Sequence, residues 1–286
     1  MIYEPTISVI GPGVMAEAII AGLLRDGLTH AGKIMASGPR GERVQQLQEM
    51  YGIVPFTDNA KAVQQADVVI LCVKPQRLDR VLAGLKGKLP DNALVLSIVA
   101  GAAIPTIASG LEHNVVVRAM PNTPAQIGEG ITVWTASSSV TEDQSDLARK
   151  ILAALGSEIF VEEEGYLDMA TALSGSGPAY VFLFMEAMVD AGVHLGFPRR
   201  IAEELVIQTI RGSVDYAAAK KTHAARLRND VTSPGGTSAA ALYYLEKAGF
   251  RTAISRAVWA AYERSQELGK GKQGQAPEKN GDSNSA

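Results

Sequence analysis

The stretch Ile7-Ser-Val-Ile-Gly11-Pro-Gly13-Val-Met-Ala16 decides the fold of the first half of this chain. A short apolar run leads directly into Gly-x-Gly-x-x-Ala, which is typical of a strand, a tight turn and a helix that bind a dinucleotide pyrophosphate. Gly11 permits the turn, Gly13 lets the backbone approach a phosphate, and Ala16 lets the helix pack on the strand. The helix N-terminus then offers free N–H groups to an anion. A glycine pair alone could be only a turn, but its place between a strand and a helix favours a cofactor site.

The first 160 or so residues alternate short apolar runs with amphipathic helical patterns, which predicts βαβ units and a parallel sheet. Strands are expected at 6–10, 33–37, 67–73, 93–97 and 115–118, and crossover helices at 15–25, 41–50, 59–65 and 76–85. The fold class is therefore α/β, with an N-terminal Rossmann-type doubly wound sheet over residues 1–164 as the dinucleotide-binding domain.

The pattern changes after Glu164, where strand signals end and helical spacing takes over. We expect an all-helical domain for substrate binding and dimerisation over 165–268, with Pro178 and Pro198 in the first turns of two long helices. In the second of these helices, one apolar face is expected to comprise Ile201, Leu205, Ile210 and Val214. Residues 269–286 have almost nothing to bury and are predicted to be disordered.

The composition excludes several classes of partner. A net charge of -3 gives no basic surface for a nucleic acid. The uncharged stretch 93–111 contains turn residues such as Pro105, which favours a buried strand and a short helix over a membrane span. The single cysteine, Cys72, lies in an apolar run, and the N-terminus has no leader pattern. We predict a cytoplasmic protein with no metal site and no membrane partner.

The second predicted strand ends in Ala36-Ser37-Gly38-Pro39-Arg40, with Arg43 one turn later. No carboxylate stands where an enzyme that prefers NAD would hold the ribose 2′-hydroxyl, and the hydroxyl and guanidinium groups suit a 2′-phosphate. Both arginines could equally be solvated surface residues. We therefore predict NADPH as the cofactor, with NADH as the alternative.

Two further strand ends should lie along the same cleft, at Val73-Lys74-Pro75 and at Ile98-Val99-Ala100. Lys74 either faces the cofactor or is a solvated loop lysine. Asn59 follows Thr57-Asp58, an evident helix N-cap, and capping is the alternative explanation of that turn.

Two segments of the helical half are predicted to bind an anion. Leu173-Ser-Gly-Ser-Gly-Pro178 and Val231-Thr-Ser-Pro-Gly-Gly-Thr-Ser238 each place small residues and hydroxyls in a turn before a helix. Exposed backbone N–H groups in such turns bind carboxylates. The alternative is that both segments are only flexible helix caps.

At these residues the sequence resembles the pyrroline-5-carboxylate reductase family, over nearly the whole chain to about Leu268. The matching stretches include Met15-Ala-Glu-Ala18, Val73-Lys-Pro-Gln76, Met120-Pro-Asn-Thr-Pro124, Leu173-Ser-Gly-Ser-Gly-Pro-Ala-Tyr180 and Val231-Thr-Ser-Pro-Gly-Gly236. The resemblance implies reduction of L-1-pyrroline-5-carboxylate to L-proline by NAD(P)H, the last step of proline synthesis. It also implies that the helices intertwine in a homodimer or in a larger ring of dimers.

The motifs and the resemblance together give a set of predicted site residues. The predicted cofactor-binding residues are Ile10, Gly11, Pro12, Gly13, Val14, Met15, Ser37, Pro39, Arg40, Asn59, Cys72, Val73, Lys74, Pro75, Ile98, Val99, Ala100 and Asp230. The predicted substrate-binding residues are Glu164, Ser174, Gly175, Ser176, Gly177, Gly235, Gly236, Thr237 and Ser238. The role of Glu164 rests on the resemblance, because in the run Glu162-Glu-Glu164 it is otherwise a surface acid.

Three positions depart from the family pattern. Val14 replaces a residue that is usually polar, which puts a side-chain contact to the phosphates in doubt. Asn229-Asp230 stands where an acid followed by an amide is common, so a cofactor hydrogen bond there becomes uncertain. Ser238 replaces a threonine and keeps its hydroxyl.

The implied chemistry needs no strong protein base, because a protonated cyclic imine is already an electrophile. We expect backbone N–H groups of the segment from Pro234 to Ser238 to hold the substrate carboxylate. Ser238 is the predicted catalytic residue, with its hydroxyl hydrogen-bonded to the ring nitrogen.

Three alternatives remain from the residues. A related NADP-dependent imine reductase would use the same site. A β-hydroxyacid dehydrogenase would typically need a lysine on the interdomain helix, and the chain has neither lysine nor asparagine from Tyr166 to Arg211. A non-enzymatic dinucleotide-binding protein would not need the two anion-binding turns.

Overall fold

The computed structural model describes residues 4–269. Its internal contacts divide the chain into two compact units. Among the described residues, unit 1 holds 4–175 and 261–269, and unit 2 holds Ser176–Ala260. Each unit is described by itself.

Unit 1 is built on one 8-stranded sheet in the order β3-β2-β1-β4-β5-β6-β7-β8. All neighbouring strands are parallel except β7, which runs antiparallel to β6. The strands are β1 (Ile7–Ile10), β2 (Ile34–Ser37), β3 (Val54–Phe56), β4 (Val68–Leu71), β5 (Leu94–Ser97), β6 (Val116–Met120), β7 (Gly130–Ala136) and β8 (Gly156–Phe160). The predicted Rossmann-type α/β class is confirmed, and all five predicted strands are present.

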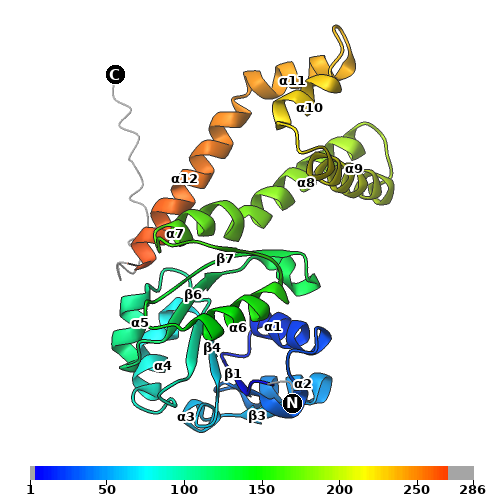
Figure 1. Cartoon of the computed structure of the whole chain (residues 1–286). Helices are drawn as coiled ribbons and strands as arrows, with labels where there is room; N and C mark the ends of the chain where they lie inside the picture. The colour runs from blue at the N-terminus through cyan, green and yellow to red at the C-terminus, as the bar shows by residue number, and fades with distance from the viewer. Residues whose placement is uncertain (1–3, 270–286) are drawn as a thin grey trace, which may run out of the picture. The chain divides into compact units, whose positions relative to one another are not determined.

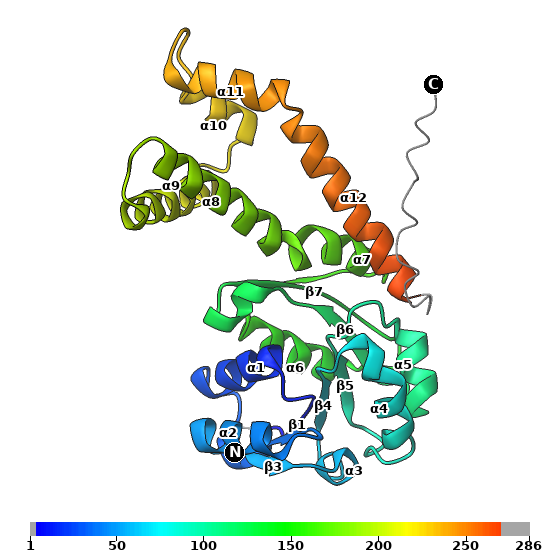
Figure 2. The ribbon, with the colours of Figure 1, turned by 180° about the vertical axis from the view of Figure 1, so that it is seen from behind.

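Helices cover both faces of this sheet (Figures 1 and 2). One face packs against α1 (Val14–Arg25), α2 (Gly41–Tyr51) and α6 (Glu142–Ala153). The other packs against α3 (Asn59–Ala62), α4 (Leu78–Leu85) and α5 (Ile104–Leu111). The central strands are buried on both faces, as a doubly wound sheet requires.

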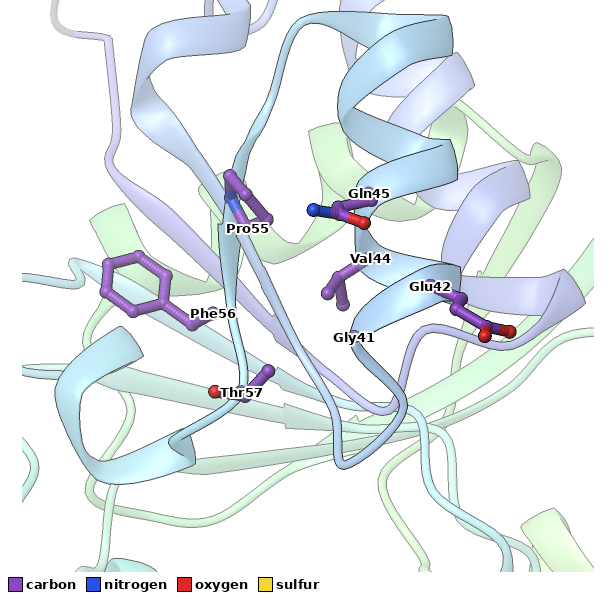
Figure 3. Close-up of a pocket in the computed structure, with 7 residues that line it drawn as sticks. All are labelled: Gly41, Glu42, Val44, Gln45, Pro55, Phe56 and Thr57. Carbon is purple, nitrogen blue, oxygen red and sulfur yellow. The ribbon is translucent and has the colours of Figure 1, made fainter.

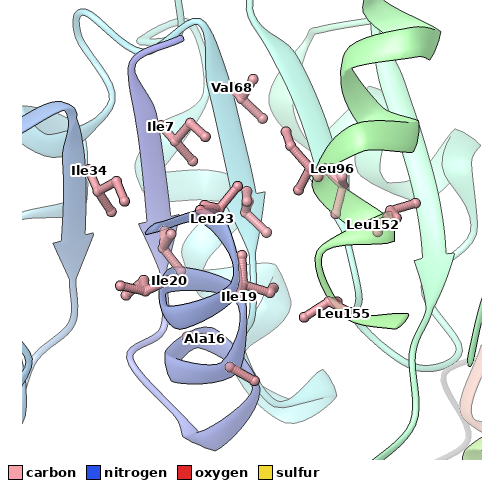
Figure 4. Close-up of a cluster of buried hydrophobic side chains, with 14 of the residues drawn as sticks. Ile7, Ala16, Ile19, Ile20, Leu23, Ile34, Val68, Leu96, Leu152 and Leu155 are labelled. Carbon is pink, nitrogen blue, oxygen red and sulfur yellow. The ribbon is translucent and has the colours of Figure 1, made fainter. Parts of the chain in front are cut away.

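The larger core cluster explains why α1 begins where it does (Figure 4). Ala16, Ile19, Ile20 and Leu23 are almost wholly buried and recur at the spacing of one helix face. These side chains pack against strand residues that include Ile7 and against Leu152 of α6. The helix therefore cannot slide along the sheet without exposing this face, and the turn that precedes it is held at a fixed place.

Unit 1 also includes the start of the helical half. Helix α7 (Tyr166–Ala170) and the π-helical turn η4 (Thr171–Gly175) belong to it. A Cβ built on Gly175 would lie 2.9 Å from Cε of Met120 in β6, so this glycine permits close packing. At Gly101, after β5, a Cβ would lie 2.9 Å from the backbone nitrogen of Gly269. The boundary between the two contact units follows Gly175, whereas the predicted domain boundary is at 164/165. Gly269 ends α12 (Phe250–Gly269), and the rest of the predicted tail lies outside the described residues.

Unit 2 contains four complete helices among its described residues and most of α12. They are α8 (Gly177–His194), α9 (Arg199–Lys220), α10 (Ala224–Asp230) and α11 (Thr237–Lys247). Pro178 occupies the first turn of α8 as predicted. Pro198 is the N-cap of α9 and not a first-turn residue. Val189 of α8 packs against Ala202 and Val206 of α9.

The predicted apolar face of α9 is not the face buried within the chain. Ile201, Leu205 and Val214 are 36%, 50% and 62% exposed, whereas Ala202 and Val206 are buried against α8. Ile210 is the one member of the predicted set that packs against this buried cluster. The helical period was predicted correctly, but periodicity alone could not decide which face this chain covers.

Unit 2 exposes many other large apolar side chains, among them Phe182, Leu183, Leu195, Tyr243 and Tyr244. Within residues 4–269 one helical stretch, Tyr166–His194, is also long and apolar enough to cross a membrane by length and composition. A helix that packs against another protein chain has the same composition. Apolar surface of this extent on a chain marks an interaction face.

Candidate functional site

The predicted phosphate loop connects β1 to α1 in a conformation that depends on its glycines. Gly11 has a φ of +98°, and a Cβ there would lie 2.7 Å from Cγ1 of Val73 and 2.9 Å from the carbonyl oxygen of Cys72. Gly13 is the N-cap of α1, in an extended conformation. No side chain of the described residues caps the first turn of α1, and a Cβ on Gly13 would meet no described atom within 4 Å. The first N–H groups of α1 therefore face an open approach for an anion.

A second glycine, Gly38, lets the loop after β2 pack on the phosphate loop. A Cβ on Gly38 would lie 2.4 Å from Cδ of Pro12. The Gly11 N–H donates to the carbonyl of Ser37 at 2.8 Å, which ties the phosphate loop to the end of β2. These contacts make the loop a preformed part of the sheet edge.

The structure brings Ser37 and Asn59 together, two residues predicted to bind the cofactor. The Ser37 hydroxyl is fully buried and donates to Oδ1 of Asn59 at 2.7 Å. Asn59 itself is half-buried, whereas Pro39 and Arg40 are exposed. The groups at this strand end that solvent can reach therefore come from Pro39, Arg40 and Asn59.

Arg43 has a role that the sequence analysis missed. Its Nε donates to the carbonyl oxygen of Pro12 at 3.1 Å, and its guanidinium pairs with the Glu17 carboxylate. Tyr51 donates to the same carboxylate at 3.2 Å. Partial burial and the neighbouring Glu17 charge raise the pKa of Tyr51 above 10.0. This cluster braces the phosphate loop from behind.

The ends of β4 and β5 lie beside the phosphate loop, as predicted for a parallel sheet. Cys72 N–H donates to the carbonyl of Ile10 at 2.8 Å, and Ile98 N–H donates to the carbonyl of Leu71 at 3.1 Å. Burial raises the pKa of the Cys72 thiol, which favours the protonated thiol at neutral pH. Lys74 is exposed, and Val99 is buried.

Glu164 is held in a polar network within unit 1. Its Oε1 accepts from the backbone N–H of Ile104 at 2.8 Å and from Arg118 of β6 at 2.9 Å. Arg118 also donates to Asp168 at 3.2 Å, and the Ser265 hydroxyl donates to the same Asp168 oxygen at 2.9 Å. Glu164 is therefore not a free surface acid, and it reaches the helix that follows the predicted cofactor turn at Ile98.

The first predicted anion-binding segment does not form the expected open turn. Residues up to Gly175 belong to the π-helical turn η4, and the Ser174 hydroxyl donates to the carbonyl of Ala170 at 2.9 Å. α8 begins again at Gly177 after Ser176. Small residues here permit a tighter helical path, and π turns of this kind occur at functional sites.

The second predicted segment does form an open turn before a helix. Gly235 has a φ of +71°, and Gly236 is the extended N-cap of α11. Thr237 and Ser238 occupy the first turn, which no side chain within residues 4–269 caps. Asp230, the last residue of α10, is exposed and pairs with Arg226 at 3.0 Å.

A cavity of about 280 Å³ lies between α2 and β3 in unit 1 (Figure 3). Its lining residues are Gly41, Glu42, Val44, Gln45, Pro55, Phe56 and Thr57. None of these residues was predicted to bind the cofactor.

Comparisons with known proteins match both halves of the chain. Residues 164–268 match the family model described as pyrroline-5-carboxylate reductase dimerisation. Residues 6–101 match the model described as NADP oxidoreductase, coenzyme F420-dependent. A pyrroline-5-carboxylate reductase from Synechocystis is 45% identical over 92% of this chain and 98% of its own. One from Escherichia coli is 36% identical over 93% of this chain and 99% of its own.

The chain belongs to the pyrroline-5-carboxylate reductase family. Solved structures agree: a family member from Coxiella burnetii has a TM-score of 0.85 at 37% identity and covers 93% of this chain and 99% of its own. A second member, from Plasmodium falciparum with NADP bound, has a TM-score of 0.84 at 31% identity over 93% and 98%. The chain is thus an oxidoreductase with a nicotinamide dinucleotide as cofactor and with a dimerisation region.

The structure adds residues to the candidate site that sequence reasoning missed. Arg118 carried a signal, since a charged residue inside a buried strand needs a partner. Asp168 lies four residues after Glu164, which places both acids on one side of a helix start. The Glu17 and Arg43 pair carried no signal, because the two residues lie on different helices.

Proposed function

We propose that this chain reduces L-1-pyrroline-5-carboxylate to L-proline and oxidises NADPH to NADP⁺. Hydride goes to the imine carbon, and the ring nitrogen keeps the proton that made it electrophilic. Two observations support the proposal: the whole-length similarity to pyrroline-5-carboxylate reductases and the uncapped helix N-terminus behind the Gly11 loop. The choice of pyrroline-5-carboxylate as the substrate rests on the similarity to pyrroline-5-carboxylate reductases.

The residues of unit 1 fit the dinucleotide. The open space at Gly13 and the free N–H groups of the first turn of α1 would hold its pyrophosphate. Asn59, Pro39 and Arg40 would meet the adenosine end, and the turn at Ile98 would line the other end. The bound nicotinamide supplies the hydride, and the protein positions the substrate and excludes water.

The preference for NADPH over NADH is supported by what stands at the end of β2. No carboxylate is present from Ala36 to Arg40 to hold a ribose 2′-hydroxyl. Arg40 is exposed and suits a 2′-phosphate. Arg43 is less suited to bind a 2′-phosphate, because its guanidinium is already paired with the Glu17 carboxylate.

The substrate carboxylate is proposed to bind the first turn of α11. The uncapped N–H groups that follow Gly235 and Gly236 support the anion site that the sequence predicts there. The Ser238 hydroxyl would hydrogen-bond the ring nitrogen as its charge is lost on reduction. A single substitution tests this role.

Replacing Ser238 with alanine should lower kcat/KM for pyrroline-5-carboxylate by about tenfold to a hundredfold, because one polarising hydrogen bond is lost. The KM for NADPH should stay within about twofold, since the hydride donor does not contact this hydroxyl. Ser238→Thr is the matched control and should keep activity. Rates are followed by the loss of NADPH absorbance. Full turnover with an unchanged KM in the alanine variant would remove Ser238 from the mechanism.

The assembly is proposed to be a homodimer or a larger ring of dimers in the cytoplasm. The dimerisation region and the exposed apolar side chains of α8, α9 and α11 support it. A single, unpaired cysteine is typical of a reducing compartment. Light scattering that gave a stable monomer at working concentration would contradict the proposal.

A further inference from the structure

Arg118 is a buried charge in the middle of a strand. It lies in β6 between Ser97 of β5 and Thr135 of β7, and its side chain is only 6% exposed. A buried guanidinium is costly unless each of its bonds is made, and apolar residues of similar size would often stabilise a sheet as well. Its place in the core therefore calls for an explanation beyond stability.

The guanidinium of Arg118 donates hydrogen bonds to two carboxylates of the same segment. Nη1 donates to Oε1 of Glu164 at 2.9 Å, and Nη2 donates to Oδ1 of Asp168 at 3.2 Å. With one positive and two negative groups, this cluster has a net charge of -1. A mostly buried site with excess negative charge favours a cationic ligand.

The two carboxylates differ in what surrounds them. Asp168 is further tied to the buried Ser265 hydroxyl at the end of α12. Glu164 is tied to the backbone of Ile104, at the start of α5, four residues beyond the predicted cofactor turn at Ala100. Oε2 of Glu164 has no hydrogen-bond partner within residues 4–269, and the side chain is 28% exposed. Oε2 of Glu164 is therefore available to a ligand.

We propose that Arg118 is a positioning residue for the substrate. It holds Oε1 of Glu164 so that the carboxylate faces the positively charged ring nitrogen of the cyclic imine or of the proline product. This assignment rests on the proposed function. Arg118 touches neither substrate nor cofactor and acts only through Glu164.

Arg118→Lys is the first variant, because it keeps the charge but cannot reach both carboxylates with a planar fork. The KM for pyrroline-5-carboxylate and the Kd for L-proline measured by calorimetry should each rise about tenfold. The KM for NADPH should change by less than about twofold. Glu164→Gln should have the same pattern, and the double variant should be no worse than Glu164→Gln alone.

Ser265→Ala is the matched control. It removes a donor from Asp168 on the other arm of the same network and leaves Glu164 in place. We expect a lower melting temperature with unchanged constants for both substrate and product. This variant separates loss of packing from loss of Glu164 positioning.

Three outcomes would overturn the proposal. In the first, Arg118→Lys raises the KM for pyrroline-5-carboxylate and the KM for NADPH by the same factor. In the second, the effects of Arg118→Lys and Glu164→Gln multiply in the double variant. In the third, Arg118→Lys leaves the Kd for L-proline unchanged. If Arg118→Lys does not fold, Glu164→Gln decides, since unchanged proline affinity there would also overturn it. A wild-type protein without turnover on pyrroline-5-carboxylate would instead reject the proposed function.

Discussion

The chain contains two turns of the same local design, Gly11-Pro12-Gly13 before α1 and Pro234-Gly235-Gly236 before α11. Each has a glycine with positive φ, +98° at Gly11 and +71° at Gly235. Each ends in an extended glycine as the N-cap, and within the described residues neither first turn has a side-chain cap. Both turns leave free N–H groups at the start of a helix.

The two turns differ in what encloses them. A Cβ on Gly11 would collide with Val73 and with the Cys72 backbone, whereas a Cβ on Gly235 would meet no described atom within 4 Å. Arg43 braces the first turn through the Pro12 carbonyl, and Gly235 is exposed. Other parts of the chain therefore fix the first turn, while the shape of the second turn is set by its own backbone.

Alanine at the two positive-φ glycines should therefore have unequal effects. Gly11→Ala adds a collision to a conformation that costs an L-residue about 1–2 kcal/mol. We expect a clear fall in melting temperature and a rise of at least about tenfold in KM for NADPH. Gly235→Ala adds no collision, so it should cost only this backbone strain of about 1–2 kcal/mol and act on the KM for pyrroline-5-carboxylate. Equal losses of stability, measured by thermal unfolding, would show that both turns are equally enclosed.

A smaller effect should separate Arg40 from Arg43 beside the first turn. Arg40→Ala should reduce the ratio of kcat/KM for NADPH over NADH by about tenfold, the loss of one charged contact to a 2′-phosphate. Arg43→Ala should weaken both cofactors by a similar factor, because it removes a brace of the loop. The two arginines lie three positions apart in one segment, so each variant is the control for the other. An unchanged ratio in Arg40→Ala would refute its proposed contact.

Much of the first turn could be predicted from sequence because its determinants are local. The strand, the glycine spacing and the helix after it all lie between Ile7 and Arg25, and the structure has each of them. Three strands were missed. β7 carries the β-branched run Ile131-Thr-Val133, a signal that sequence reasoning could have used, whereas β3 and β8 lack such a pattern. β3 is a three-residue strand with Pro55 at its centre, and β8 contains Glu158 and is largely exposed. Hydrophobic periodicity cannot detect strands of this kind.

The contacts of the candidate site were less predictable because they join distant residues. Arg118 meets Glu164 and Asp168 across 46 and 50 residues. Family resemblance selected Glu164, but only the fold shows what holds it. The segment at Ser174 was predicted to be an open turn, yet η4 continues the helix with wider spacing. Small residues are compatible with both conformations, and contacts such as Met120 with Gly175 decide between them.

The smallest predicted effect concerns Tyr51, the outermost member of the brace on the first turn. Its pKa is raised in the folded protein, mainly by burial and then by Glu17. Below pH 10 the phenol is protonated in both states and contributes no pH dependence. Above pH 10 the unfolded chain releases this proton while the folded chain keeps it, so stability falls as the pH rises toward the folded pKa. Tyr51→Phe removes that fall and loses one hydrogen bond, worth about 0.5–1.5 kcal/mol at neutral pH. Urea unfolding at pH 8 and at pH 10.5 measures this: the wild type should lose more stability between the two pH values than Tyr51→Phe does. Equal losses would show that the folded protein does not hold the Tyr51 proton.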